Sequence, residues 1–135
     1  MRLSRSGADL VVQAPAKLNL FFEVLGKRDD GYHEIESLVT PIDLYDTLYF
    51  REDRSGQVTF ACQRVSWSGR AGGAVLGEIP DGRENLVVRA VELLRERAGV
   101  DRGAQVRLVK RIPAAAGLGG GSSDAAAALM SMLVG

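Results

Sequence analysis

The chain has 135 residues, enough for one domain with a modest hydrophobic core and too few for two well-packed ones. Its 17 basic residues balance 17 acidic residues, so the charge gives no indication of a surface that binds nucleic acid or a membrane. The only cysteine, Cys62, cannot form an internal disulfide or a cysteine-rich metal site, and no apolar run is long enough to cross a membrane. These features indicate a soluble cytoplasmic domain.

The first half of the chain has the pattern of short strands joined by turns. β-branched or alternating apolar residues predict strands at residues 10–14, 16–25, 35–40, 47–51 and 57–62, with a bend at 42–46. Pro15 and Pro41 are expected to end two of these strands, because proline lacks the N–H that a sheet needs. Asp30 and Gly31 predict a hairpin turn. The expected result is a mostly antiparallel sheet.

The predicted strand at 16–25 carries an unusual polar pair. Alternation places Leu18, Leu20, Phe22 and Val24 on one face, and Lys17, Asn19, Phe21 and Glu23 on the other. An edge strand that turns polar side chains to solvent would explain Lys17 and Asn19, and so would a functional pair. The pattern alone leaves both interpretations open.

The second half of the chain predicts a helix and a further strand. Residues 63–84 are rich in glycine, contain the only tryptophan and are expected to form a long surface connection. Asn85 is expected to cap a helix with an apolar face, which Gly99 ends. Residues 104–112 predict a strand whose basic residues alternate outward. The order of strands, helix, strand, loop and helix indicates an α+β fold.

The most distinctive stretch is 113–129, where four glycines precede two serines and an alanine-rich run. Glycine lets a ligand approach the main-chain N–H groups, and Ser122 is a good N-cap, so a helix is expected to begin there. Such a loop, ending on a helix N-terminus, favours an anion, and phosphate is the preferred ligand. The alternative is a flexible turn before a buried helix. The stretch does not fit the Walker A pattern, because Ser122 and not a lysine follows Gly121. It does not fit G-x-G-x-x-G either, because counting from Gly117 places Ser122 at the last glycine.

The sequence Gly-Leu-Gly-Gly-Gly-Ser-Ser-Asp at 117–124 resembles the phosphate loop of the GHMP kinases, a family of small-molecule kinases. Its form is most like one branch of that family, the 4-diphosphocytidyl-2-C-methyl-D-erythritol kinases of the non-mevalonate isoprenoid pathway. Segments similar to other motifs of this branch follow in the family's order, at 14–20, 30–34, 41–46 and 84–90. The resemblance implies the ribosomal protein S5 domain 2-like fold. It also implies that residues 1–135 are an incomplete GHMP kinase N-terminal domain, with the family's catalytic aspartate beyond Gly135.

The resemblance further implies a reaction and its residues. The γ-phosphoryl group of ATP would pass, with Mg²⁺, to the 2-hydroxyl of diphosphocytidyl-methylerythritol. Lys17 would be catalytic and Asn19 would bind the substrate, while Tyr32 would stack on the cytosine and His33 would hydrogen-bond to it. The ATP-binding residues would be Pro113, Ala114, Ala115, Ala116, Gly117, Leu118, Gly119, Gly120, Gly121, Ser122 and Ser123. Mg²⁺ would lie near the last two.

Three features limit what the resemblance implies. Val39 stands where the family often has a second aromatic against the base, which would loosen the cytosine pocket. Asp124 directly follows the loop and is expected to be a helix-terminus or Mg²⁺-shell group, not the catalytic aspartate. The last predicted helix has nothing to cover its apolar residues Leu129, Met130, Leu133 and Val134. The chain alone is therefore expected to be inactive and poorly soluble.

Other functions compete with this interpretation. Without the resemblance, His33 would be a surface or packing residue more often than one that binds a base. A serine hydrolase is disfavoured because the chain has no G-x-S-x-G motif. A GHMP kinase acting on mevalonate, homoserine or a sugar is the nearest enzymatic alternative, and residues 31–33 disfavour it. A non-catalytic S5-like module that contacts RNA is the alternative of another class, and the balanced charge and the glycine loop disfavour it.

Overall fold

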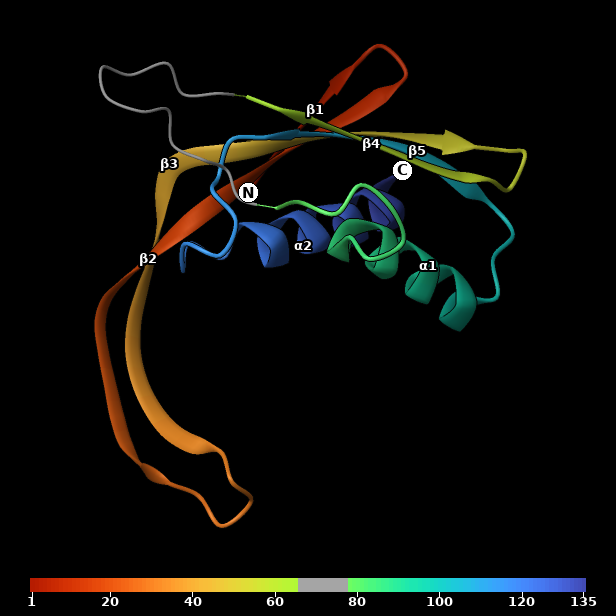
Figure 1. Ribbon diagram of the computed structural model, residues 1–135. Coiled ribbons are helices and arrows are strands. Elements are labelled where there is room, and N and C mark those ends of the chain that lie inside the picture. The colour runs from red at the N-terminus through yellow and green to blue at the C-terminus, as the bar shows by residue number, and fades with distance from the viewer. Residues whose placement is uncertain (66–77) are drawn as a thin grey trace.

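The computed structural model describes residues 1–65 and 78–135. In these ranges, a five-stranded sheet of order β1-β2-β3-β5-β4 has two helices on one face (Figure 1). The elements are β1 Arg2–Ser6, β2 Asp9–Lys27, β3 His33–Asp53, β4 Val58–Arg64, α1 Leu86–Ala98, β5 Gly103–Lys110 and α2 Gly120–Val134. Neighbouring strands are antiparallel except β4 and β5, which are parallel. The predicted α+β class is confirmed.

The hydrophobic core lies between the sheet and the two helices. Alternate residues of β2, β3 and β5 face the helices, and Val12, Leu48 and Leu108 are almost completely buried there. Ala127 and Ala128 of α2 have no exposed surface. Small side chains let a helix approach a sheet closely, so this packing fixes the position of α2 and of the glycine loop before it.

β2 and β3 are each one long strand, so the prediction that Pro15 and Pro41 end strands is wrong. Pro15 pairs with Tyr45 and Lys17 pairs with Pro41, with a register shift between Pro15 and Lys17. This irregularity leaves Ala16 and residues 42–44 without partners in the ladder, which accommodates a residue that cannot donate a backbone hydrogen bond. The predicted bend at 42–46 also lies within β3.

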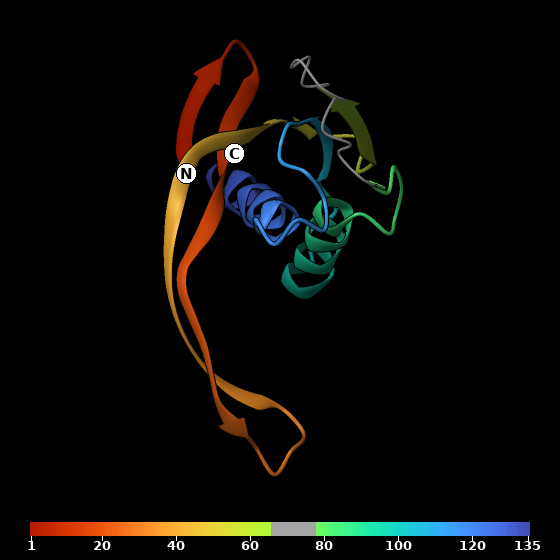
Figure 2. The same ribbon diagram turned by 60° about the vertical axis from the view of Figure 1, so that its left-hand side comes forward.

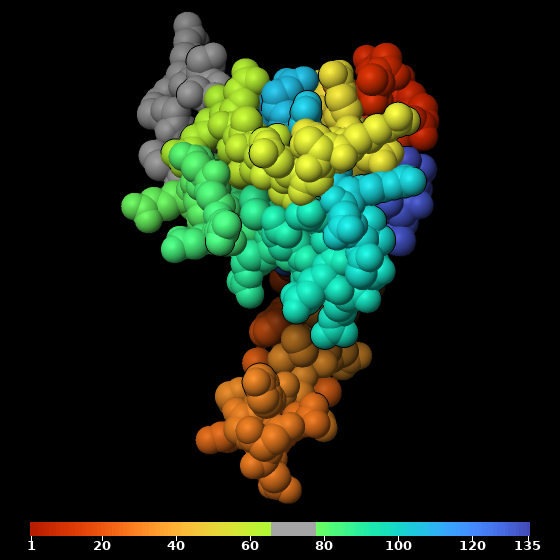
Figure 3. Space-filling model, turned by 90° about the vertical axis from the view of Figure 1, so that its right-hand side faces the viewer, coloured from red at the N-terminus to blue at the C-terminus, as the bar shows by residue number. Residues whose placement is uncertain are grey.

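Residues 18–40 form a two-stranded extension of β2 and β3, which we call the arm. The arm curves toward the side of the sheet that carries the helices (Figures 1 and 2), and it projects from the rest of the chain (Figure 3). Its turn contains Gly31 with φ +88°, which confirms the predicted hairpin. Apolar side chains are exposed on both faces of the arm, among them Leu20, Phe22, Leu25, Ile35 and Leu38. The predicted apolar face is therefore not buried among the described residues.

Helix α1 begins and ends as predicted. The side chain of Asn85 accepts a hydrogen bond from the N–H of Val87 at 2.9 Å, and Gly99 ends the helix in the left-handed conformation. Of the predicted connection at 63–84, residues 66–77 lie outside the described residues, and Gln63 and Arg64 belong to β4. No helix in the described ranges is long and apolar enough to cross a membrane.

Strand β5 ends two residues earlier than predicted, and one of its basic residues points inward. Gln105 and Arg107 are exposed as expected, but Lys110 is only 3% exposed. Lys110 shares the inward face with Val106 and Leu108, because side chains alternate along a strand. The prediction that the basic residues of this strand point outward is therefore wrong for Lys110.

Candidate active site

The glycine stretch forms a loop between β5 and α2. The helix begins at Gly120, and Gly119 precedes it with φ 68°, so the prediction that Ser122 is the N-cap is wrong. Gly117 and Ala115 also have positive φ, of 72° and 56°. An α-helix leaves the N–H groups of its first turn without partners inside the helix, and here that turn includes Ser122. The loop thus delivers free donors and the positive end of the helix dipole to one place.

Lys17 lies against this loop. Its backbone N–H donates to the carbonyl of Leu118 at 2.9 Å. A Cβ added at Gly119 would lie 3.1 Å from both Cγ and Cε of the Lys17 side chain, so the lysine stem crosses the loop in close contact. Nζ of Lys17 donates to the side-chain oxygen of Asn19 at 3.1 Å. The structure therefore brings the polar pair of β2 to the start of α2.

Tyr32 and His33 lie elsewhere. Both are exposed, Tyr32 by 74%, at the tip of the arm and away from the glycine loop (Figures 1 and 2). Val39, also on the arm, pairs with Asn19 across the two strands. The structure does not bring Tyr32 and His33 to Lys17, and their role as cytosine-binding residues stays a prediction.

An apolar cavity adjoins the loop on the side of α1. Its volume is about 180 Å³, and its lining includes Ile79, Leu86 and Leu108 together with the charged residues Lys110 and Asp124. A second hollow of about 250 Å³ is lined by the loop from Pro113 to Ser122 and by Leu86. The two hollows share Leu86 and part of the loop, so an apolar pocket and a polar cradle lie side by side.

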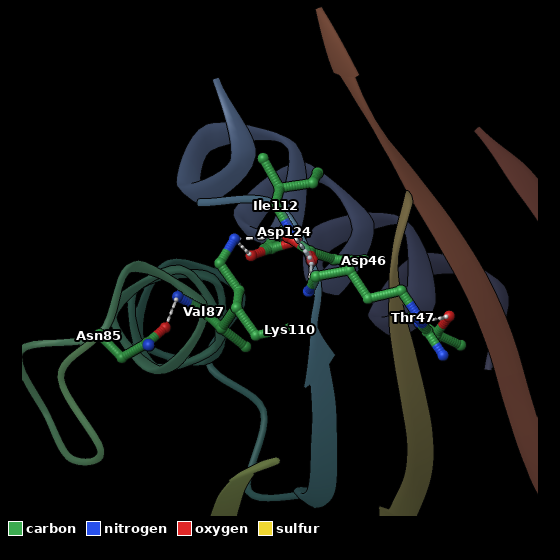
Figure 4. Close-up of polar contacts among 8 residues, drawn as sticks. Asp46, Thr47, Asn85, Val87, Lys110, Ile112 and Asp124 are labelled. Atoms are coloured by element: carbon green, nitrogen blue, oxygen red, sulfur yellow. Dashed lines mark hydrogen bonds and ion pairs between the residues drawn. The ribbon is translucent and has the colours of Figure 1, made fainter. Parts of the chain in front are cut away.

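A buried ion network lies beneath the loop (Figure 4). Nζ of Lys110 donates to the carboxylate of Asp124 at 2.9 Å and also to the carboxylate of Asp46. One oxygen of Asp46 accepts the backbone N–H groups of Arg111 and Ile112, the latter at 2.9 Å. The side chains of the three charged residues are at most 4% exposed.

The electrostatics of this network are set by two carboxylates facing one ammonium group. Burial, with the nearby charge of Asp46 as a second cause, raises the pKa of Asp124 to about 7. Burial lowers the pKa of Lys110, but the two carboxylates outweigh it, so that this pKa lies above its ordinary value. Asp124 lies beyond the first turn of α2, so the prediction of a helix-terminus group is wrong.

Sequence reasoning missed this network, although one signal was present. Lys110 lies two residues after Leu108 on β5, and Asp46 lies two residues before Leu48 on β3. The alternation that identified the core therefore also directs both charged side chains inward. The partner of each was not visible in the sequence, because Asp46 and Lys110 are 64 residues apart.

The hydroxyls of Ser122 and Ser123 lie in the first turn of α2, where Ser122 is exposed and Ser123 is half-buried. In the part of the chain that the structure describes, no group of three or more His, Cys, Asp or Glu residues could hold a metal ion.

Comparison with known proteins relates this arrangement to a family. Residues 85–133 match the family model described as the GHMP kinases N terminal domain. The chain is 51% identical over 119 residues to a 4-diphosphocytidyl-2-C-methyl-D-erythritol kinase of Pelotomaculum thermopropionicum, covering 88% of this chain and 37% of that protein. A crystal structure of a 4-(cytidine 5'-diphospho)-2C-methyl-D-erythritol kinase superposes with a TM-score of 0.69 at 40% identity, covering 92% of this chain and 40% of that one. A homoserine kinase from Cytophaga hutchinsonii superposes with a TM-score of 0.62 at 16% identity over 98% of this chain and 36% of its own, which shows the fold alone.

Residues 85–133 thus match the N-terminal domain of the GHMP kinases, and the chain has the fold of the corresponding part of these kinase structures. Within that family it is similar to the kinases named for diphosphocytidyl-methylerythritol. It spans about two fifths of the length of these relatives.

Proposed function

We propose that this chain is the N-terminal part of a kinase that transfers the γ-phosphoryl group of ATP to the 2-hydroxyl of 4-diphosphocytidyl-2-C-methyl-D-erythritol. The observation that carries the proposal is the contact between Lys17 and the glycine loop at the N-terminus of α2. A lysine beside a cradle of N–H donors is the combination that phosphoryl transfer needs, because catalysis there consists of positioning and charge stabilisation.

ATP would lie across the two adjoining hollows. Its phosphates would bind to the loop, where free N–H groups and the helix dipole favour negative charge. Its base would enter the apolar cavity between Leu86 and Leu108. The adjacency of an apolar pocket and an anion cradle supports a nucleotide over a simple phosphate ester.

Magnesium would be held chiefly by the phosphates of ATP, since Mg²⁺ in such sites takes few protein ligands. The hydroxyls of Ser122 and Ser123 fit this role, because they are oxygen donors in the first turn of α2. When bound, the ion would neutralise charge on the phosphates.

Lys17 would act on the substrate hydroxyl and the transferred phosphoryl group. The backbone at Gly119 lies against the side-chain stem of Lys17, and Asn19 accepts a hydrogen bond from its ammonium group. The positive charge would therefore be oriented before substrates bind. In the reaction, the hydroxyl oxygen bonds to the γ-phosphorus, and the bond to the ADP oxygen breaks. The ammonium would stabilise the negative charge that develops on these oxygens. By resemblance to the family, the hydroxyl proton would pass to an aspartate beyond Gly135.

Tyr32 and His33 would bind the cytosine of the second substrate, Tyr32 by stacking and His33 by hydrogen bonds. Lys27 pairs with His33 at the tip of the arm, and it lies ten residues along β2 from Lys17. An extended strand of that length spans up to about 33 Å. This part of the proposal requires the arm to bring its tip closer to the loop than it is here. The curvature of the arm toward the helices is in the right direction (Figure 2).

The test is a phosphorylation assay with the full-length protein, ATP and a panel of alcohols. ADP release should depend on diphosphocytidyl-methylerythritol and should be absent with mevalonate, homoserine and galactose. Phosphorylation of one of the other alcohols, with none of diphosphocytidyl-methylerythritol, would contradict the substrate while leaving the family intact.

A further inference from the structure

We propose that Asp46, Lys110 and Asp124 are positioning residues. They fix the two ends of the glycine loop relative to each other and thereby set the affinity for nucleotide phosphates. The inference rests on the proposed function, because it assigns these residues a part in binding ATP. It differs from the role proposed for Lys17, because these side chains lie beneath the loop and are at most 4% exposed.

The start of the loop is held by Asp46. This residue belongs to β3, and one of its carboxylate oxygens accepts the N–H groups of Arg111 and Ile112. These two residues directly precede Pro113, where the loop begins. Two charge-assisted hydrogen bonds to consecutive backbone groups determine the direction in which the chain leaves β5.

The end of the loop is held by Asp124. This carboxylate lies on α2, four residues after the helix begins, and it accepts a hydrogen bond from Lys110 on β5. Since Lys110 also donates to Asp46, one ammonium group connects the strand before the loop, the neighbouring strand and the helix after it (Figure 4). A shift of α2 relative to β5 would therefore break a buried ionic contact.

Gly120 provides an independent indication that this approach is close. A Cβ at Gly120 would lie 2.8 Å from Nζ of Lys110 and 2.8 Å from Cγ2 of Ile112. Gly120 does not have a positive φ, so glycine is required here by the lack of space and not by the backbone conformation. The first residue of α2 thus sits directly on the ion network.

Two other roles for Lys110 fit the structure less well. A lysine near a phosphate loop could itself bind phosphate, but the Lys110 side chain is 4% exposed and already faces two carboxylates. A purely stabilising role is also weak, because buried ion pairs recover little more than the cost of removing their charges from water. The buried charged network is better explained by a role in fixing the geometry of the adjoining backbone.

The experiment removes the bridge without changing the net charge of the network. The variant Lys110→Met/Asp124→Asn in the full-length protein loses one positive and one negative charge and retains Asp46 with its two backbone contacts. The matched control is Ser131→Ala, because Ser131 is fully buried on the same helix and bonds only within it, to the carbonyl of Ala127. Binding of ADP is measured by calorimetry, and the KM of each substrate by ADP release.

The double variant should fold, bind ADP about tenfold more weakly and raise the KM for ATP, with the KM for the alcohol substrate within about twofold of wild type. A general loss of stability would not separate the two KM values. ADP affinity within about twofold of wild type in the folded variant would overturn the inference. Asp46→Asn, at a residue that lines neither hollow, should weaken ADP binding in the same direction and decides the inference if the double variant does not fold. Wild-type protein that binds ADP but phosphorylates no diphosphocytidyl-methylerythritol would remove the proposed function and leave the ADP comparison intact.

Discussion

Replacement of Gly119 by alanine tests the contact between Lys17 and the loop, and Gly117 offers a matched control. Both glycines have left-handed backbone conformations, with φ of 68° and 72°. Alanine costs about 1–2 kcal/mol in that conformation, so the two substitutions carry nearly the same backbone strain. They differ in their surroundings. A Cβ at Gly119 would lie 3.1 Å from two carbons of Lys17, whereas a Cβ at Gly117 meets nothing within 4 Å.

The difference between the two variants therefore measures the displacement of Lys17. Carbon atoms in good contact lie about 3.5–4.0 Å apart, so the lysine stem must move by several tenths of an ångström or more. A misplacement of about 1 Å at a reacting centre can cost about 100-fold in rate. We expect kcat of Gly119→Ala to be about tenfold or more below that of Gly117→Ala, with similar melting temperatures. The assay is steady-state ADP release by the full-length protein. Equal kcat values in the two variants would refute the idea that the Lys17–Gly119 contact positions the catalytic charge.

Four further outcomes follow from the same geometry. Lys17→Met should lower kcat by about 100-fold or more and leave the calorimetric affinity for ADP unchanged, and near-normal turnover would remove Lys17 from the mechanism. Tyr32→Ala should raise the KM for diphosphocytidyl-methylerythritol by about tenfold through lost stacking, with the KM for ATP unaffected as the internal control. Because burial raises the pKa of Asp124 from 3.8 to about 7, the unfolded chain releases this proton first, so the free energy of unfolding falls by up to about 4 kcal/mol as pH rises from 4 to 7. Asp124→Asn should remove that fall, as measured by denaturant titrations of both proteins at pH 5 and pH 8. The same pH dependence in both proteins would show that Asp124 is not its source. Residues 1–135 expressed alone should show no kinase activity and should bind a hydrophobic dye through the arm and through Leu133, which is 73% exposed, and steady turnover by this chain would mean that the catalytic groups are misassigned.

The local elements that depend on neighbouring residues could be predicted from the sequence. Asn85 and Gly99 mark the ends of α1, because a side-chain acceptor and a left-handed glycine satisfy helix termini through contacts a few residues away. Gly31 likewise identifies the hairpin turn, because its left-handed backbone conformation is a local property of the turn. The glycines before α2 were recognisable as a loop that leads into a helix, although the helix begins at Gly120 and not at Ser122.

Features that depend on residues far apart in the sequence could be seen only in the folded chain. Pro15 lies within β2 because a register shift against β3 accommodates it, and no local pattern specifies that pairing. Lys17 contacts Gly119, and only the packing of α2 on β2 brings these residues together.

Lys110 illustrates the difference most clearly. Strand alternation directs its side chain inward, but a lysine is buried only where opposite charges compensate the loss of water. Those charges come from Asp46 and Asp124, which are 64 and 14 residues away along the chain. Periodicity could therefore identify the face on which Lys110 lies, whereas its ionic partners, and with them the link between the two ends of the loop, were decided by the fold.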